Sequence, residues 1–294
     1  MSVDAKGAGH RESYQRAVRR KRLVLLFLLL LSAGVGVLSI GTGSCPIDAG
    51  TIIRCIFGGE VDETSRYLIM SLRLPRAAAA VVAGAGLGLS GAALQTLLRN
   101  PLASPFTLGI SQGAAFGAAF AIIVLGAGQG HMAGGEGVTF FSHAPVVVSA
   151  FAGSLVTIAF ILTLSRVGNV TTESMILAGI GLSAFFSACT MLLQYFADDI
   201  QVAATVFWTF GDLGKAGWRE VLLMTAALAP ACIYFTRHGW SCNALHWGDE
   251  TAQSLGVGVK GLRMTGMLLA GLVISVATAF LGIIGFIGLL APHC

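Results

Sequence analysis

Apolar runs of about 20 residues, separated by short polar segments, recur along the chain and constrain its fold more than any other feature. An α-helix of that length spans the hydrocarbon core of a bilayer. Charged residues make up only 11% of the 294 residues, whereas soluble domains carry about 25%. That charge is too little to cover a surface in water, so the sequence predicts one all-α polytopic membrane domain.

The ends of the apolar runs set the expected spans. Seven complete spans and the start of an eighth are expected, at residues 23–40, 75–98, 106–125, 145–164, 174–196, 221–235, 264–281 and from 282 onward. Residues 1–22 hold seven Lys or Arg and two acidic residues, and basic flanks stay in the cytoplasm under the positive-inside rule. We therefore expect a basic cytoplasmic tail over 1–22 and a transmembrane domain over 23–294.

A glycine-rich stretch in the second span contains the pattern G-x-G-x-x-G at Gly86, Gly88 and Gly91. A dinucleotide-binding fingerprint has a strand before it and a helix after it, whereas this stretch lies inside one apolar run. In lipid, small residues four apart let helix backbones approach closely, so packing is the preferred interpretation. The expected packing residues are Gly84 and Gly88 in the second span, and Gly109, Gly113 and Gly117 in the third.

Ionisable side chains are missing from the centres of the expected spans. Ion-coupled carriers place such groups inside the membrane, where they are costly and are kept for function. The polar residues that do occur, such as Gln95, Ser111 and Gln112, fit either hydrogen bonds between helices or a weakly polar path for a cargo. Such a path needs a driving force from another protein; an ion-coupled secondary transporter is the alternative.

Catalytic and metal-binding patterns are also missing from the sequence. No paired carboxylates, H-E-x-x-H or Ser/His arrangement occurs, and the six cysteines and six histidines show no ligand spacing. No G-x-x-x-x-G-K-[ST] loop occurs, so ATP hydrolysis would belong to another chain. We expect a protein that is not an enzyme and binds no metal or cofactor directly. Cys45 and Cys55 share the first outside loop, either as a disulfide or as two thiols.

Four ordered motifs resemble one known family. The first runs from residue 72 to 118 and contains R-L-P-R, a small-residue helix, R-N-P-L-A-x-P and L-G-I-S-x-G-A. The others are VFWTFGDLGKAGW at 206–218, LHWGDETAQSLGV at 245–257 and IIGFIGLLAPH at 283–293. Together they resemble the FecCD family, the membrane permeases of ABC importers for iron–siderophore complexes, haem and cobalamin. The resemblance covers about residues 23–293.

The resemblance implies a fold of ten helices per subunit in the bacterial cytoplasmic (inner) membrane, with a cytoplasmic N-terminus. Two permease copies, two ATP-binding subunits that use the ATP, and a periplasmic or lipid-anchored substrate-binding protein would form the importer, without nucleic acid. Ferric siderophore is the first cargo expected by family abundance, followed by haem and cobalamin. The family pattern continues past the Pro-His motif with two more spans, so the resemblance also implies a chain that is incomplete at its C-terminus.

Arg73 and Arg76 stand three apart, on one helix face at the outer end of the second span. Their position fits snorkelling to the membrane surface or the docking of a partner that carries carboxylates. The resemblance implies docking, because the arginines of this motif pair with glutamates on the binding protein.

The segment between the sixth and seventh spans is expected to form a short helix, with Gly256 as its C-terminal stop. By itself this segment fits a solvated loop helix, whereas the resemblance implies that it couples the permease to the ATPase. The coupling residues implied are Asp249, Glu250, Thr251, Ser254, Leu255 and Gly256.

Pro101 ends the second span on the cytoplasmic side, because proline cannot continue a helix and restricts Asn100 before it. This turn fits a gate near the inner end of the path or a plain connection between antiparallel helices. The expected path or gate residues are Gln95, Asn100, Pro101, Ser111, Gln112 and Gly113.

Overall fold

The computed structural model describes residues 3–43, 45–127, 143–166 and 171–293, and these are almost entirely helical. Within these ranges, six helices are long and apolar enough to cross a membrane. They are Val18–Gly41, Glu63–Leu97, Ala144–Leu164, Thr172–Tyr195, Trp218–Arg237 and Val259–Leu281, and the shorter helix Ile110–Ile123 is also apolar. The prediction of an all-α polytopic membrane protein is confirmed.

The first of two compact units comprises residues 1–77. It contains α1 (Val3–Gly41), α2 (Ala49–Ile56), α3 (Glu63–Tyr67) and the π-helical segment η1 (Leu68–Arg73). Ile40, Ile52, Cys55 and Ile69 form its small core. The leucine-rich side chains at 23–31 of α1 are exposed, as suits a helix that is apolar on every side and surrounded by lipid. Helix α1 also includes most of the basic tail, which is therefore continuous with the first span.

The second expected span starts earlier than Pro75. Helical turns run without a break from Glu63 through η1 into α4 (Leu74–Leu97). Proline cannot donate the backbone hydrogen bond that an α-helix needs at this position. The π-helical turns before Pro75 accommodate this loss, since the amide of Leu74 bonds to the carbonyl of Ile69, five residues back. Pro75 therefore lies inside a helix and does not open one.

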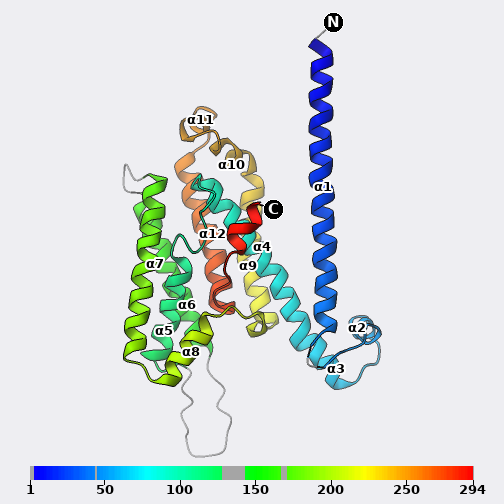
Figure 1. The fold of residues 1–294 in the computed structure, drawn as a ribbon, viewed down its shortest axis with the longest axis vertical. Coiled ribbons are helices and arrows are strands. Elements are labelled where there is room, and N and C mark those ends of the chain that lie inside the picture. The colour runs from blue at the N-terminus through cyan, green and yellow to red at the C-terminus, as the bar shows by residue number, and fades with distance from the viewer. Residues whose placement is uncertain (1–2, 44, 128–142, 167–170, 294) are drawn as a thin grey trace, which may run out of the picture. The chain divides into compact units, whose positions relative to one another are not determined.

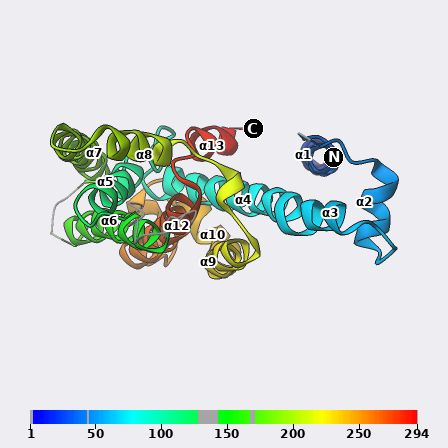
Figure 2. The ribbon, with the colours of Figure 1, turned by 90° about the horizontal axis from the view of Figure 1, so that it is seen from below.

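The second unit, residues 78–294, is a bundle of helices. After α4 it contains α5 (Ile110–Ile123), α6 (His143–Leu164), α7 (Thr172–Tyr195), α8 (Asp199–Thr209), α9 (Trp218–Arg237), α10 (Gly239–Leu245), α11 (Asp249–Ser254), α12 (Val259–Leu281) and α13 (Ile287–Leu290). Helix α5 packs against α6, α7 and α8, while α12 packs against α6 and α9 (Figure 1 and Figure 2). Helices α5 and α12 are accordingly mostly buried, and α4 also contributes residues to the main core.

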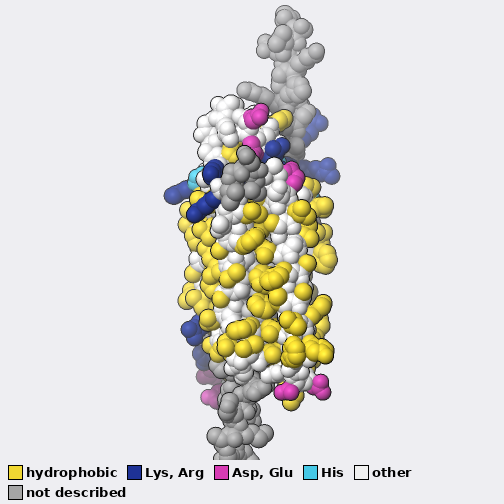
Figure 3. Space-filling view, turned by 90° about the vertical axis from the view of Figure 1, so that its left-hand side faces the viewer, with side chains coloured by type: hydrophobic (Ala, Val, Ile, Leu, Met, Phe, Trp, Pro, Cys, Tyr) yellow, Lys and Arg dark blue, Asp and Glu magenta, His cyan; other side chains and the backbone are white. Residues whose placement is uncertain are grey.

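The surface of the bundle has the zoning expected of a membrane protein. On the face shown in Figure 3, hydrophobic side chains cover the middle and charged side chains gather toward the two ends. Exposed apolar residues on α7, among them Leu177, Phe185 and Leu192, contribute to this surface. Such a belt matches the hydrocarbon layer of a bilayer, with the charges at the level of the headgroups.

Two further expected spans, the third and the eighth, differ from the structure. The third begins at Ile110 instead of residue 106, because Gly109 has a φ of 75° and ends the preceding turn in the left-handed region. The eighth does not start at residue 282. Gly282 (φ 79°) terminates α12, Ile283 then pairs with Phe210 in an isolated parallel bridge, and helix resumes only in the short α13. The residues after α12 therefore fold back against the bundle.

Candidate functional site

The predicted coupling segment forms an exposed structure at one end of α12. Helices α10 and α11 lie beyond the N-terminal end of α12 in Figure 1. Gly256 has a φ of 84° just after α11, which is the left-handed stop expected there. Ala252 and Leu245 are fully buried and anchor the segment. The exposed members of the predicted set are Glu250, Thr251, Ser254, Leu255 and Gly256.

Asp249 differs from the rest of this set because its carboxylate is bound by arginine side chains of the same chain. The guanidinium of Arg263, on α12, donates from Nη2 to both carboxylate oxygens at 3.1 Å. Arg263 Nε donates at the same time to the backbone carbonyl of Leu97, at 2.9 Å. Arg99 Nη1 lies 3.7 Å from Asp249 Oδ1. Sequence reasoning missed Arg263, since only the fold brings α12 beside the end of α4.

The turn after α4 is built from its own side chains. The Asn100 side chain accepts from the amide of Leu102 at 2.8 Å, and the Asn100 amide donates to the carbonyl of Gln95 at 3.0 Å. Arg99 adopts a φ of 49°, in the left-handed region. A local hydrogen bond of this kind and a left-handed residue are what a sharp helix end needs.

The segment around α13 is hydrogen-bonded to the same end of α4 and to the turn after it. Gln95 Nε2 donates to the carbonyl of Leu289 at 3.2 Å, and a ring nitrogen of His293 lies 3.3 Å from the carbonyl of Pro101. Three of the predicted path residues, Gln95, Asn100 and Pro101, are therefore together at one end of the bundle. The roles predicted for them remain predictions.

The other three predicted path residues lie in the first turns of α5. Ser111 is buried, and Gln112 is half-buried. Gly113 faces α6 so closely that a Cβ atom there would lie 2.7 Å from the carbonyl oxygen of Gly153. Within this chain, the backbone at Gly113 is in contact with another helix and not with an open channel.

The predicted packing glycines have different surroundings. Gly117, like Gly113, faces the α6 backbone, with the carbonyl of Ser149 as its neighbour. Gly109 precedes α5 and faces α7, where a Cβ atom would lie 3.0 Å from the carbonyl oxygen of Gly179. Gly88 meets Ala291. Gly84 meets no atom within 4 Å, so it makes no close helix contact within this chain, and its packing role remains a prediction.

Gly91 has the tight contact that was expected of Gly84. Its neighbour is the backbone of Gly288 in α13. A spacing of four residues selects a helix face, but the α13 segment crosses α4 at a point that this spacing does not specify. Two glycines of the G-x-G-x-x-G pattern, Gly88 and Gly91, therefore lie at close contacts with the segment around α13. This agrees with the packing interpretation of the pattern.

Arg73 is bound to its own unit. Its Nη1 donates to the carbonyl of Ile40 at 2.7 Å and to that of Gly41 at 3.4 Å, and its Nη2 donates to the carbonyl of Cys45. The side chain thereby caps the C-terminal end of α1. Arg76, one helical turn later, is exposed. The docking role predicted for the two arginines remains a prediction.

A lysine fills a similar position beyond α8. Lys215 Nζ lies 3.4 Å from the carbonyl oxygens of Trp208 and Phe210, at the end of that helix. Burial lowers the pKa of the Lys215 amine, and the charge of Asp212 opposes this effect. Within the 206–218 motif, the Lys215 amine thus binds carbonyl oxygens at the C-terminal end of α8.

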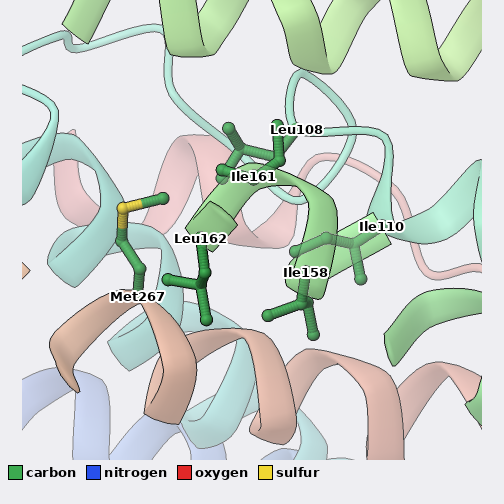
Figure 4. Close-up of a pocket in the computed structure, with 6 residues that line it drawn as sticks. All are labelled: Leu108, Ile110, Ile158, Ile161, Leu162 and Met267. Carbon is green, nitrogen blue, oxygen red and sulfur yellow. The ribbon is translucent and has the colours of Figure 1, made fainter. Parts of the chain in front are cut away.

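A small apolar cavity lies inside the bundle. Its walls are Leu108, Ile110, Ile158, Ile161, Leu162 and Met267 (Figure 4). Its volume of about 10 Å³ is near the minimum that holds one water molecule. No polar group of its lining could orient a ligand, so this cavity is a packing defect and no cargo site.

Other chemistry that the sequence left open is also visible. Among the residues that the structure describes, no group of three His, Cys, Asp or Glu side chains could hold a metal ion. Cys45 and Cys55 are free thiols, of which Cys45 is exposed and Cys55 buried.

A bundle of apolar helices with an exposed helical segment fixed at one end has the architecture of a transport permease. The sequence pattern of the FecCD transport family matches residues 25–294, and the chain belongs to that family. It is therefore an ABC importer permease.

The relatives span most of the chain. A protein of Methanocaldococcus jannaschii, named as an ABC transporter permease, is 46% identical over 92% of this chain and 76% of its own length. The hemin transport system permease protein HmuU of Yersinia pestis is 36% identical over 92% of this chain and 78% of its own. A solved structure, described as an inward-facing ABC transporter of the metal-chelate type, superimposes with a TM-score of 0.76 and 29% identity, covering 92% of this chain and 80% of that one. Other relatives are named as import permeases for Fe(3+)-citrate, vitamin B12 and molybdate.

Proposed function

We propose that this chain is the membrane subunit of an importer for an iron complex, a ferric siderophore or haem, and that a separate ATP-binding subunit drives it. The hemin and Fe(3+)-citrate relatives support this cargo class. Cobalamin and molybdate are the competing cargoes, because other relatives carry those names. The permease itself binds no cofactor in this proposal, and nothing in the geometry of the described residues favours ion-coupled transport.

The exposed α11 segment is the single observation that carries the proposal. Leu255 presents an apolar side chain that is 52% exposed beside the polar Glu250, Thr251 and Ser254. An apolar anchor with a polar rim is what a groove on a partner protein recognises. Ala252 and Leu245 hold the segment firmly on the bundle, so a force applied to it by the ATPase is transmitted to α12.

In this proposal the periplasmic surface of the permease receives the cargo. Arg76 is exposed and can attract carboxylates of a periplasmic or lipid-anchored substrate-binding protein. Arg73 holds the end of α1 beside it, and so orders the docking surface. Two permease copies then enclose the path, with two ATP-binding subunits on the cytoplasmic side of the inner membrane and the basic N-terminus on that same side.

The test is cargo uptake by the reconstituted importer. The permease, its co-purified ATP-binding subunit and its binding protein are placed in liposomes, and hemin, ferric citrate, cyanocobalamin and molybdate are offered in separate experiments. We expect accumulation of hemin or ferric citrate that requires internal ATP. Uptake of cyanocobalamin or molybdate alone would contradict the cargo class, and uptake by the permease without its ATPase would contradict the proposed function.

A further inference from the structure

One carboxylate joins three elements at the α11 end of the bundle. Asp249 is the first residue of α11, and its two oxygens bind the guanidinium of Arg263 on α12. The same guanidinium donates from Nε to the carbonyl of Leu97, the last residue of α4. Arg263 therefore contacts α11 and the end of α4 simultaneously, although α11 and α4 are far apart in the sequence.

The environment of this contact strengthens it. The side chain of Arg263 is only 17% exposed and that of Asp249 is 36% exposed, so water screens the pair less than it screens a surface ion pair. Arg99 adds a second positive charge 3.7 Å from the carboxylate. The planar guanidinium fork can bind a carboxylate and a carbonyl together, which the single ammonium group of lysine does less well.

The Arg263 contact at Leu97 lies next to the turn that follows α4. The Asn100–Pro101 turn follows directly, and the α13 segment is attached to it through His293 and to α4 through Gln95. A displacement of α11 would thus reach this turn through Arg263 and Asp249, by a much shorter route than along the chain.

We propose that Arg263 is a positioning residue that makes α11, α12 and the Leu97 end of α4 move as one body when the ATPase moves α11. This inference rests on the proposed function, because it takes α11 as the surface that the ATPase contacts. Without Arg263, only the longer Arg99–Asp249 contact would join α11 to the end of α4. We therefore expect α11 to move further than the Asn100–Pro101 turn, so that ATP hydrolysis is poorly coupled to transport.

The first test measures a distance in the assembled complex of the permease with its ATP-binding subunit. Spin labels are attached at Gln253→Cys on α11 and Leu102→Cys after α4, in a background without the native cysteines; both positions are exposed. We expect the wild-type distance to keep its mean and width between the nucleotide-free state and the ATP–vanadate state. In Arg263→Gln the distance should shift or broaden between these states.

A second variant covers the event that Arg263→Gln does not assemble. Asp249→Ala leaves Arg263 on the carbonyl of Leu97 and leaves the exposed face of α11 intact, so it should release only α11 and give the same shift. The inference is overturned if the wild-type distance already changes between the states, or if the variants keep it unchanged.

The second readout is the amount of cargo taken up per ATP hydrolysed, which a purely structural role would not alter. For the cargo that the wild-type complex accumulates among hemin and ferric citrate, Arg263→Gln should lower this ratio by roughly tenfold. Arg263→Lys should lie in between. Lys260→Gln removes an exposed charge from the same end of α12 and should keep the wild-type ratio.

The two proposals fail in different ways. If wild-type liposomes accumulate neither compound, hemin and ferric citrate are excluded as cargo, and the distance measurement still decides the role of Arg263. If the wild type accumulates cargo and Arg263→Gln does so with the same yield per ATP, the proposed function stands and the inference is wrong.

Discussion

In the described part of the chain, basic side chains bind backbone carbonyls at the C-terminal ends of α1, α4 and α8. Arg73 binds carbonyls at the end of α1, Arg263 binds the last carbonyl of α4, and Lys215 lies on the carbonyls beyond α8. The last carbonyls of any helix lack partners within the helix, and a cation there also complements the helix dipole. A carbonyl that is shielded from water and lacks a partner is costly. A basic residue near a helix end therefore has a structural use that competes with any docking role.

A residue-scale prediction separates these two uses for the R-L-P-R motif. Arg73→Gln should raise amide hydrogen exchange at Thr42 and Ile47, whose amides bond to Leu38 and Gly41 at the end of α1. We expect an increase of about tenfold, because hydrogen bonds to a charged group are lost. Arg76→Gln is the matched control and should leave this exchange unchanged. Equal exchange in the two variants would contradict the capping role of Arg73.

At the scale of helices, the sequence predicted the membrane spans well and the irregular segments poorly. Spans two, four and seven end within one residue of Leu97, Leu164 and Leu281, because the edge of an apolar run marks the edge of the lipid. The fold of residues 282–293 was not predictable, since it depends on Phe210 meeting Ile283 and on Gly91 meeting Gly288. Contacts between distant segments leave no periodic signal in a single sequence.

The small-residue faces give an element-scale prediction. Gly117→Ala should destabilise the protein by about 1–3 kcal/mol, because the added methyl group would overlap the α6 backbone at Ser149. Gly84→Ala adds the same methyl group where no atom lies within 4 Å, and alanine favours the helix. It should be neutral or slightly stabilising.

Thermal unfolding of the purified protein in detergent measures both glycine variants. We expect a lower unfolding midpoint for Gly117→Ala and an unchanged or higher one for Gly84→Ala. The reverse order would show that α5 and α6 do not pack through Gly117.

At the scale of the whole molecule, the chain provides a scaffold and contact surfaces but no energy-transducing chemistry that its described residues reveal. Its family could be predicted because four motifs occur in order. The link through Arg263 could not, because Asp249, Arg263 and Leu97 meet only once α4 and α12 are packed. The small apolar cavity at Met267 has no room for an iron complex.

The central claim is that partner proteins at the two membrane faces move this permease. Cargo uptake by liposomes that hold the complete importer and internal ATP tests it most directly, with vanadate or an ionophore added in parallel. We expect vanadate to stop uptake and the ionophore to leave it unchanged. Uptake that survives vanadate and stops with the ionophore would show that an ion gradient, and not the ATPase, drives this permease.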